Sequence, residues 1–163
     1  MTQEELEKAF VDVMQKVITE KDAIFAVCRE VLDEALDTSE LDRIATRLQD
    51  QVLGMAERVR KLVEENARVR RDQEKYQREY EALVAEHEKL SRQIQAVEAQ
   101  KRDKADRRRK IEVFLCMLEE QTECVRFDSY TFVALVDRVI VRQDRTLEFI
   151  FRNGMKYEYI IVV

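Results

Sequence analysis

Apolar residues in the first third of the chain recur at steps of three and four, the spacing of one helix face. Thr2 and Glu5 have the spacing of a capping box, which predicts that a helix begins here. The apolar stripe is wide, so we expect this helix to pack on more than one neighbour. Asp37, Thr38 and Ser39 compete with the helical backbone for hydrogen bonds and predict a break near 37–39. The stripe and its flank comprise Leu6, Phe10, Val13, Met14, Val17, Ile18, Ile24, Phe25, Val27, Val31 and Leu32.

A heptad pattern begins at Leu41 and predicts a left-handed coiled coil. Its polar exceptions are Asn66, Gln73 and His87, and we interpret His87 as a polar seam residue that fixes register rather than as a metal ligand. One seam position is Leu41, Leu48, Met55, Leu62, Val69, Tyr76, Leu83, Leu90 and Val97. The other is Ala45, Val52, Val59, Asn66, Gln73, Tyr80, His87 and Ile94.

The polar stretch at 64–75 leaves two interpretations open. The heptads can form one straight helix of roughly 80 residues, about 120 Å long. Alternatively, the chain can reverse within 66–72 and form an antiparallel hairpin. Neither Gly nor Pro lies there, so composition does not separate the two.

The C-terminal part predicts a short helix followed by a three-stranded antiparallel meander. Asp128 is a suitable N-cap for a helix over 129–138, and Phe127 can staple to Phe132 in the first turns. Strands are predicted over 139–141, 146–151 and 155–162.

The alternation of faces predicts the register of these strands. A three-residue loop, 152–154, pairs Phe149 with Tyr157 and keeps one face apolar, with Gly154 left-handed. The same rule pairs Val139 with Phe149 and leaves Arg145 left-handed in the first loop, where glycine would be easier. The apolar face is expected to pack on the base of the helical arm; it comprises Leu147, Phe149, Phe151, Met155, Tyr157 and Tyr159.

The predicted fold class is therefore mainly α, with long coiled-coil helices and a small C-terminal α+β knob. We expect a helical arm over 1–121, with breaks near 37–39 and 66–72, and a small end over 122–163 that packs on the base of the arm.

Charge changes this picture at one segment. The chain has 39% charged residues and a net charge of −5, which argues against a dedicated nucleic-acid binder. Residues 101–110, "KRDKADRRRK", are nonetheless strongly basic. The run is either a solvated helix face or a phosphate-facing patch. Its possible DNA contacts are Lys101, Arg102, Lys104, Arg107, Arg108, Arg109 and Lys110.

Other chemistry finds little support. Cys28, Cys116 and Cys124 are widely spaced and His87 is the only histidine, so neither a disulfide framework nor a zinc site is expected. No cofactor, clustered carboxylates, nucleophile–base pair or glycine-rich phosphate loop indicates an enzyme. The acidic start and the lack of an apolar run of about 20 residues favour a soluble, intracellular protein without a membrane partner.

The order of these segments resembles a known family. The block "RRRKIEVFLCMLEEQTECVRFDSYTFVALVDRVIVRQDRTLEFIFRNGMKYEY", preceded by "DQEKYQREYEALVAEHEKL", is similar to the C-terminal part of large serine recombinases of conjugative and mobilisable transposons. The resemblance covers nearly the whole chain and is most specific over 111–157. Arg145 departs from the family pattern, in which Gly is common there.

The resemblance implies that the catalytic domain and the zinc ribbon lie upstream, because Ser39, Ser91 and Ser129 lack the catalytic motif. It also implies a bacterial, cytoplasmic protein whose helical hairpin contacts other recombinase subunits during synapsis and contributes to directionality. This favours a reversal of the chain within 66–72 over one straight helix. The alternatives are an auxiliary DNA-backbone-binding segment of the same recombinase and an autonomous coiled-coil adaptor. The expected subunit contacts are Val59, Leu62, Val69, Tyr76 and Tyr80.

Overall fold

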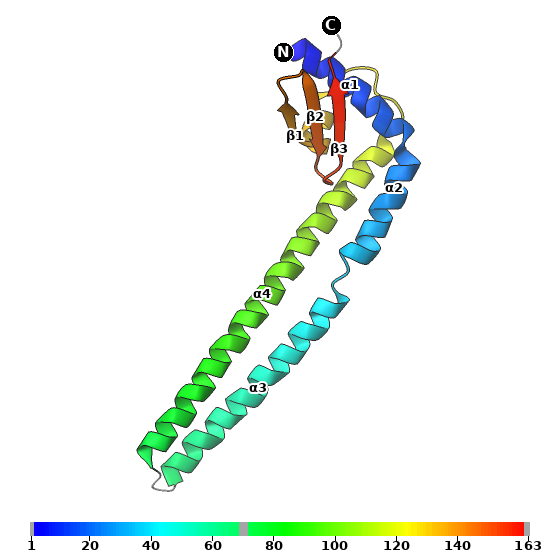
Figure 1. Ribbon diagram of the computed structural model, residues 1–163. Coiled ribbons are helices and arrows are strands. Elements are labelled where there is room, and N and C mark those ends of the chain that lie inside the picture. Colours follow the sequence, from blue (N-terminus) through cyan, green and yellow to red (C-terminus); the bar gives the residue numbers. More distant parts are fainter. Residues whose placement is uncertain (1, 69–71, 162–163) are drawn as a thin grey trace. The chain divides into compact units, whose positions relative to one another are not determined.

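The computed structural model describes residues 2–68 and 72–161, and it confirms the predicted class of long helices followed by a three-stranded antiparallel sheet (Figure 1). The helices are α1 (Gln3–Thr19), α2 (Lys21–Glu30), the π-helix η1 (Val31–Ala35), α3 (Ser39–Arg68), α4 (Gln73–Glu120) and α5 (Ser129–Leu135). The strands are β1 (Val136–Val141), β2 (Thr146–Phe151) and β3 (Lys156–Ile160), in the order β1-β2-β3.

The chain divides into two compact units. The first, which we call the sheet unit, is Met1–Leu36 together with Ala105–Val163; the second, the hairpin unit, is Asp37–Lys104. This differs from the expected division at 121/122. The first helices group with the sheet rather than with the coiled coil, because their apolar stripe is buried in the same core as the strands.

The start of the chain follows its capping signal. The Thr2 hydroxyl accepts a hydrogen bond from the Glu5 N–H at 3.2 Å, and the Glu5 carboxylate accepts one from the Thr2 N–H at 2.7 Å. The helix then breaks at Glu20, where the sequence has neither Gly nor Pro. After α2 it widens into the π-helix, in which the Leu36 N–H donates to the Val31 carbonyl. α3 begins at Ser39, so the predicted break at 37–39 is confirmed.

The core of the sheet unit explains the wide stripe of α1. Phe10 is fully buried, and its ring lies 5.1 Å from Phe132 of α5 and 6.4 Å from Phe149 of β2, between ring centroids. The end of α4 contributes Phe114, whose ring packs on Phe151 at 5.8 Å. The stripe therefore contacts both the short helix and the sheet, as its width predicts.

The sheet register agrees with the prediction from alternating faces. β2 and β3 pair Phe149 with Tyr157, and the Phe151 N–H donates to the Met155 carbonyl at 2.8 Å. Gly154 has φ 89°. β1 pairs Val139 with Phe149, and Arg145 is left-handed with φ 64°. Both loops therefore have the predicted three-residue form.

The boundary between α5 and β1 differs from the prediction. The helix ends at Leu135 instead of 138, and β1 begins at Val136 instead of 139. Val136 pairs with Phe151, and the Arg152 N–H donates to the Leu135 carbonyl at 2.9 Å, so the sheet captures this segment. The start of α5 is as predicted, because the Asp128 carboxylate accepts from the Thr131 N–H at 2.7 Å.

Candidate interaction surface of the helical hairpin

The hairpin unit consists of α3 and the first part of α4, which run antiparallel side by side (Figure 1). Two ion pairs fix their register: Lys101 with Asp42 at 2.8 Å and Arg58 with Glu86 at 3.6 Å. α3 ends at Arg68, α4 begins at Gln73 and the two helices run antiparallel, which supports the hairpin interpretation. Residues 69–71 of the predicted break lie outside the described residues. The buried seam is Ala45, Leu48, Met55, Leu62, Leu83, Leu90 and Val97, with Leu41, Ile44, Val52, Val59, Tyr76 and Ile94 packed against it.

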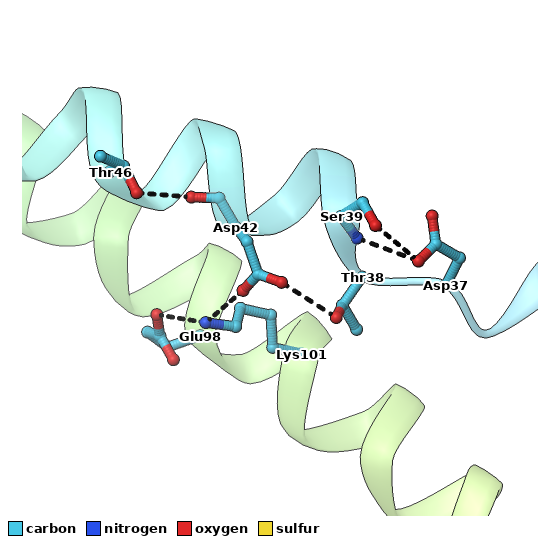
Figure 2. A network of polar contacts seen from close by, with 7 residues as sticks. All are labelled: Asp37, Thr38, Ser39, Asp42, Thr46, Glu98 and Lys101. Carbon is cyan, nitrogen blue, oxygen red and sulfur yellow. Dashed lines mark hydrogen bonds and ion pairs between the residues drawn. The ribbon is translucent and has the colours of Figure 1, made fainter.

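A polar network closes the open end of this hairpin, as Figure 2 shows. The Asp42 carboxylate binds Lys101 and accepts a hydrogen bond from the Thr38 hydroxyl at 3.1 Å. Lys101 also contacts Glu98 at 3.3 Å. The hydrogen bond from Lys101 lowers the pKa of the Asp42 carboxyl, and the same bond raises the pKa of Lys101. The seam therefore ends in a charged clasp that joins the start of α3 to α4.

The clasp gives a structural role to part of the basic run. Lys104 donates to the Asp37 carbonyl at 2.7 Å, and Arg108 donates to the Leu32 carbonyl. Like Lys101, these two residues hold positions that continue the heptad spacing beyond its apolar part, and all three are half-buried. The remaining cations of the run are exposed: Arg102, Arg107, Arg109 and Lys110. Lys101, Lys104 and Arg108 therefore hold the backbone or a side chain of another segment of the chain, whereas the other cations of the run face solvent.

One broad face of the hairpin is polar, and we call it the charged face. The Arg58–Glu86 pair spans it, and exposed Gly54 and Ala82 are the small residues among its charges. Two shallow grooves run along it, with Leu48, Met55, Leu62, Leu83 and Leu90 at their floors. Their polar walls are Arg47, Gln51, Arg58, Lys61, Glu65, Glu79, Glu86, Lys89 and Gln93.

The opposite face is mainly apolar, with His87 and Ser91 as its polar residues, and we call it the open face. Its two stripes follow the spacing i, i+4, i+7, i+11, which places residues on one side of a helix. The side chains of Val63, Tyr80 and Val84 are 45%, 37% and 38% exposed, although they border the seam. The stripe on α3 is Val52, Ala56, Val59 and Val63, and the stripe on α4 is Tyr80, Val84, His87 and Ser91.

The two stripes lie at matching heights. The ion pair between Asp42 and Lys101 sets the register of the two helices. Val52 comes ten residues after Asp42 and Ser91 ten residues before Lys101, so Val52 is level with Ser91. The same count places Val59 beside Val84, and Val63 beside Tyr80. Two helices can bury only the narrow seam between them, so this second stripe stays accessible among the described residues.

The expected contact residues fall in different places. Leu62 is buried in the seam and Tyr76 is partly buried there, stacked on Tyr80 with 6.2 Å between ring centroids. Val59 is half-buried between the seam and the open face, while Tyr80 reaches the open face. Val69 lies outside the described residues.

His87 is exposed on the open face and is not among the residues that form or cover the buried seam, so its interpretation as a polar seam residue that fixes register is wrong. The heptad count missed Ala56, Val63 and Val84, because it tracks one seam and not a second stripe beside it. The signal was present in the sequence as apolar residues displaced by one position from the heptad.

Two of the three thiols lie in surroundings that disfavour reactivity. Burial raises the pKa of Cys28 and of Cys124, which disfavours the nucleophilic thiolate. Across residues 2–68 and 72–161, no group of three His, Cys, Asp or Glu side chains could hold a metal ion.

Comparisons of the chain with protein-family models, with curated proteins and with solved structures found no match. In the part of the chain that the structure describes, no helix has the length and apolarity needed to cross a membrane.

Proposed function

We propose that the chain is the coiled-coil interaction module of a site-specific DNA recombinase, in which the hairpin unit contacts other subunits during synapsis and contributes to the direction of recombination. The observation that carries this proposal is the open face, because a hairpin that served only as a spacer would need just its seam. Exposed, contiguous apolar surface on a helix pair is typical of a surface that another protein covers.

The resemblance supplies the recombinase context. It rests mainly on the segment 111–157, which belongs to the sheet unit. This segment contains the end of α4, the N-cap of α5 and most of the strands. In this proposal the sheet unit anchors the hairpin, and the chemistry of DNA cleavage resides in an upstream catalytic domain of the parent protein.

The proposal is tested by recombination between attachment sites with the parent protein. Val63→Glu on the open face is expected to reduce recombination strongly while each attachment site is still bound, as read by gel shift. The matched control is Ala82→Glu, which adds the same charge to the charged face. Full recombination with Val63→Glu would overturn the proposal.

The coding sequence immediately upstream provides a second check. A serine-recombinase catalytic domain in the same reading frame is expected there. A stop codon in its place would favour an autonomous coiled-coil adaptor.

The basic run supports a second candidate function, auxiliary binding of the DNA backbone. The exposed side chains of Arg102, Arg107 and Lys110 have no ion pair among the described residues, so they are available to phosphates. Binding of the chain to duplex DNA should then weaken steeply with salt. No binding at about 50 mM salt, within the range where phosphate contacts are strong, would exclude this function for the chain.

A further inference from the structure

An apolar pocket lies within the sheet unit, between α2, the end of α4 and the β2–β3 loop. Its volume is about 420 Å³, within the range of about 300–1,000 Å³ that is typical of ligand sites. An apolar cavity of only about 150 Å³ already holds benzene. The pocket therefore has room for a body larger than one aromatic ring.

The pocket has a buried end and an open mouth. Its buried residues are Ile24, Cys28 and Ile111, which are 7%, 8% and 7% exposed, whereas Val27 is 60% exposed and marks the mouth. All of the side chains that line it are apolar except those of Glu20 and Asn153, if the buried thiol is counted as apolar. An apolar ligand body that enters the pocket is thus removed from water, which favours binding.

The polar atoms of Asn153 are already used by the protein. The side-chain Oδ1 accepts a hydrogen bond from the Met155 N–H at 3.1 Å, and Nδ2 donates to the Cys28 Sγ at 3.8 Å. These contacts hold the β2–β3 loop, in which Gly154 is left-handed, against α2. The wall that the loop contributes is therefore preorganised, which reduces the cost of ordering on binding.

Glu20 gives the pocket a negative charge. No Lys, Arg or His is present among the described residues that line it. The Tyr157 hydroxyl donates to the Glu20 carboxylate and so fixes its position. Burial, together with this hydrogen bond, raises the pKa of Tyr157 to about 12, so the hydroxyl remains a donor at neutral pH.

The cations nearest to Glu20 in the sequence do not neutralise it. Lys21 donates to the Glu119 and Gln121 carbonyls, at 2.7 Å and 3.2 Å. Lys16, one helical turn before Glu20, makes no ion pair with it in the part of the chain that the structure describes. The carboxylate is therefore available to a positive charge on a ligand.

The geometry points to a small hydrophobic amine as the ligand of this pocket, with its apolar body between α2 and the β2–β3 loop and its protonated nitrogen at the Glu20 carboxylate. The body has the size of one or two rings or of a comparable aliphatic chain. Such a ligand stabilises the sheet unit, because it binds only the folded state. All residues of the site belong to the sheet unit, so the inference does not rest on the proposed function of the hairpin unit.

Three probes that share one apolar body test this inference. Phenylbutylamine, phenylbutanol and phenylbutyrate are cationic, neutral and anionic at neutral pH, and titration of the full isotope-labelled chain, followed by NMR, measures their affinity and location. The amine should bind roughly threefold more tightly than the alcohol, as expected for an exposed ion pair, and phenylbutyrate should bind most weakly. The shifted amide signals should lie in α2 and in 153–155. No binding of the amine, equal binding of the three probes, or shifts confined to other segments would overturn the inference.

Two variants test the role of the carboxylate. Glu20→Gln keeps the size of the side chain and an acceptor for the Tyr157 hydroxyl, and it should lower the affinity for the amine to that for the alcohol. Asp22→Asn removes the same charge from an α2 residue that does not line the pocket, and it should leave both affinities unchanged. A preference for the amine that survives Glu20→Gln, or that is lost equally in Asp22→Asn, would show the assignment to be wrong. If circular dichroism shows that Glu20→Gln does not fold, the three probes on the unchanged chain decide.

Discussion

Replacing Arg145 by glycine should stabilise the sheet unit. Arg145 lies between β1 and β2 with φ 64°, and its backbone is held by the Arg142 carbonyl at 3.1 Å and by the Ile161 N–H at 3.3 Å. A left-handed residue with a Cβ is strained by about 1–2 kcal/mol. Glycine removes this strain but adds about 0.4–1 kcal/mol of unfolded-state freedom. The net gain expected is thus about 0.5–1 kcal/mol.

The side chain needs its own control, because Arg145 also attracts Glu5 and so helps to lower the pKa of that carboxyl, mainly set by its hydrogen bond with the Thr2 N–H. Arg145→Ala removes the charge and keeps the strain, so the difference between the Gly and Ala variants isolates the backbone. Urea denaturation, with hydrogen exchange of the β2–β3 segment, measures it. A chain of this size should gain about 1–4 °C in Tm. If the Gly variant is no more stable than the Ala variant, the reasoning about this loop is refuted.

Three further predictions follow from the two units. Phe10→Ala should destabilise the sheet unit by about 3–5 kcal/mol, because it leaves a cavity among three aromatic rings; loss of exchange protection in β2 checks this, and unchanged protection would contradict the grouping of α1 with the sheet. Lys101→Gln should loosen the start of α3 at neutral pH, seen as faster amide exchange over 39–46, whereas Lys89→Gln on the charged face should not. The Asp42 carboxyl has a lowered pKa, so the stability from this ion pair is present above the ordinary aspartate pKa of about 3.9 and is lost as pH falls through the folded-state value. The difference between Lys101→Gln and the unchanged chain should therefore disappear in acid, and a difference that persists there would exclude the Asp42 pair as its cause.

The sheet was predicted in detail because the residues that specify its register lie close together in the sequence. The faces of β2 and β3 agree in only one register, so Phe149 and Tyr157 had to pair, and Arg145 had to be left-handed. The capping residues Thr2 and Asp128 likewise act within three residues of their own position.

Long-range grouping was not predictable in the same way. The stripe around Phe10 indicates that the helix is buried, but its partner Phe149 lies far along the chain, and no periodicity encodes which apolar face covers which. The break at Glu20 is a second example, since no local breaker marks it and buried residues of one core lie on both sides of it.

The candidate site was predictable only in part. The heptad located the seam, including Leu62 and Tyr76, but it assumed that every seam position would be covered. In this pair of helices Tyr80 and His87, at the second seam position of α4, are exposed, and so is Val84, which lies beside them off the heptad. The accessible stripe depends on how many helices meet, which a single sequence does not state.

In the sequence, the hairpin unit lies between the two segments that form the sheet unit, one ending at Leu36 and the other beginning at Ala105. It is therefore an insertion in the sheet unit. Its length is therefore independent of the sheet unit. Removing one heptad from α3 and the heptad at the same height from α4 would keep the buried seam and the ion pair of Lys101 with Asp42 in register. The hairpin unit can thus be shortened or extended in steps of two helical turns while the sequence of the sheet unit stays unchanged.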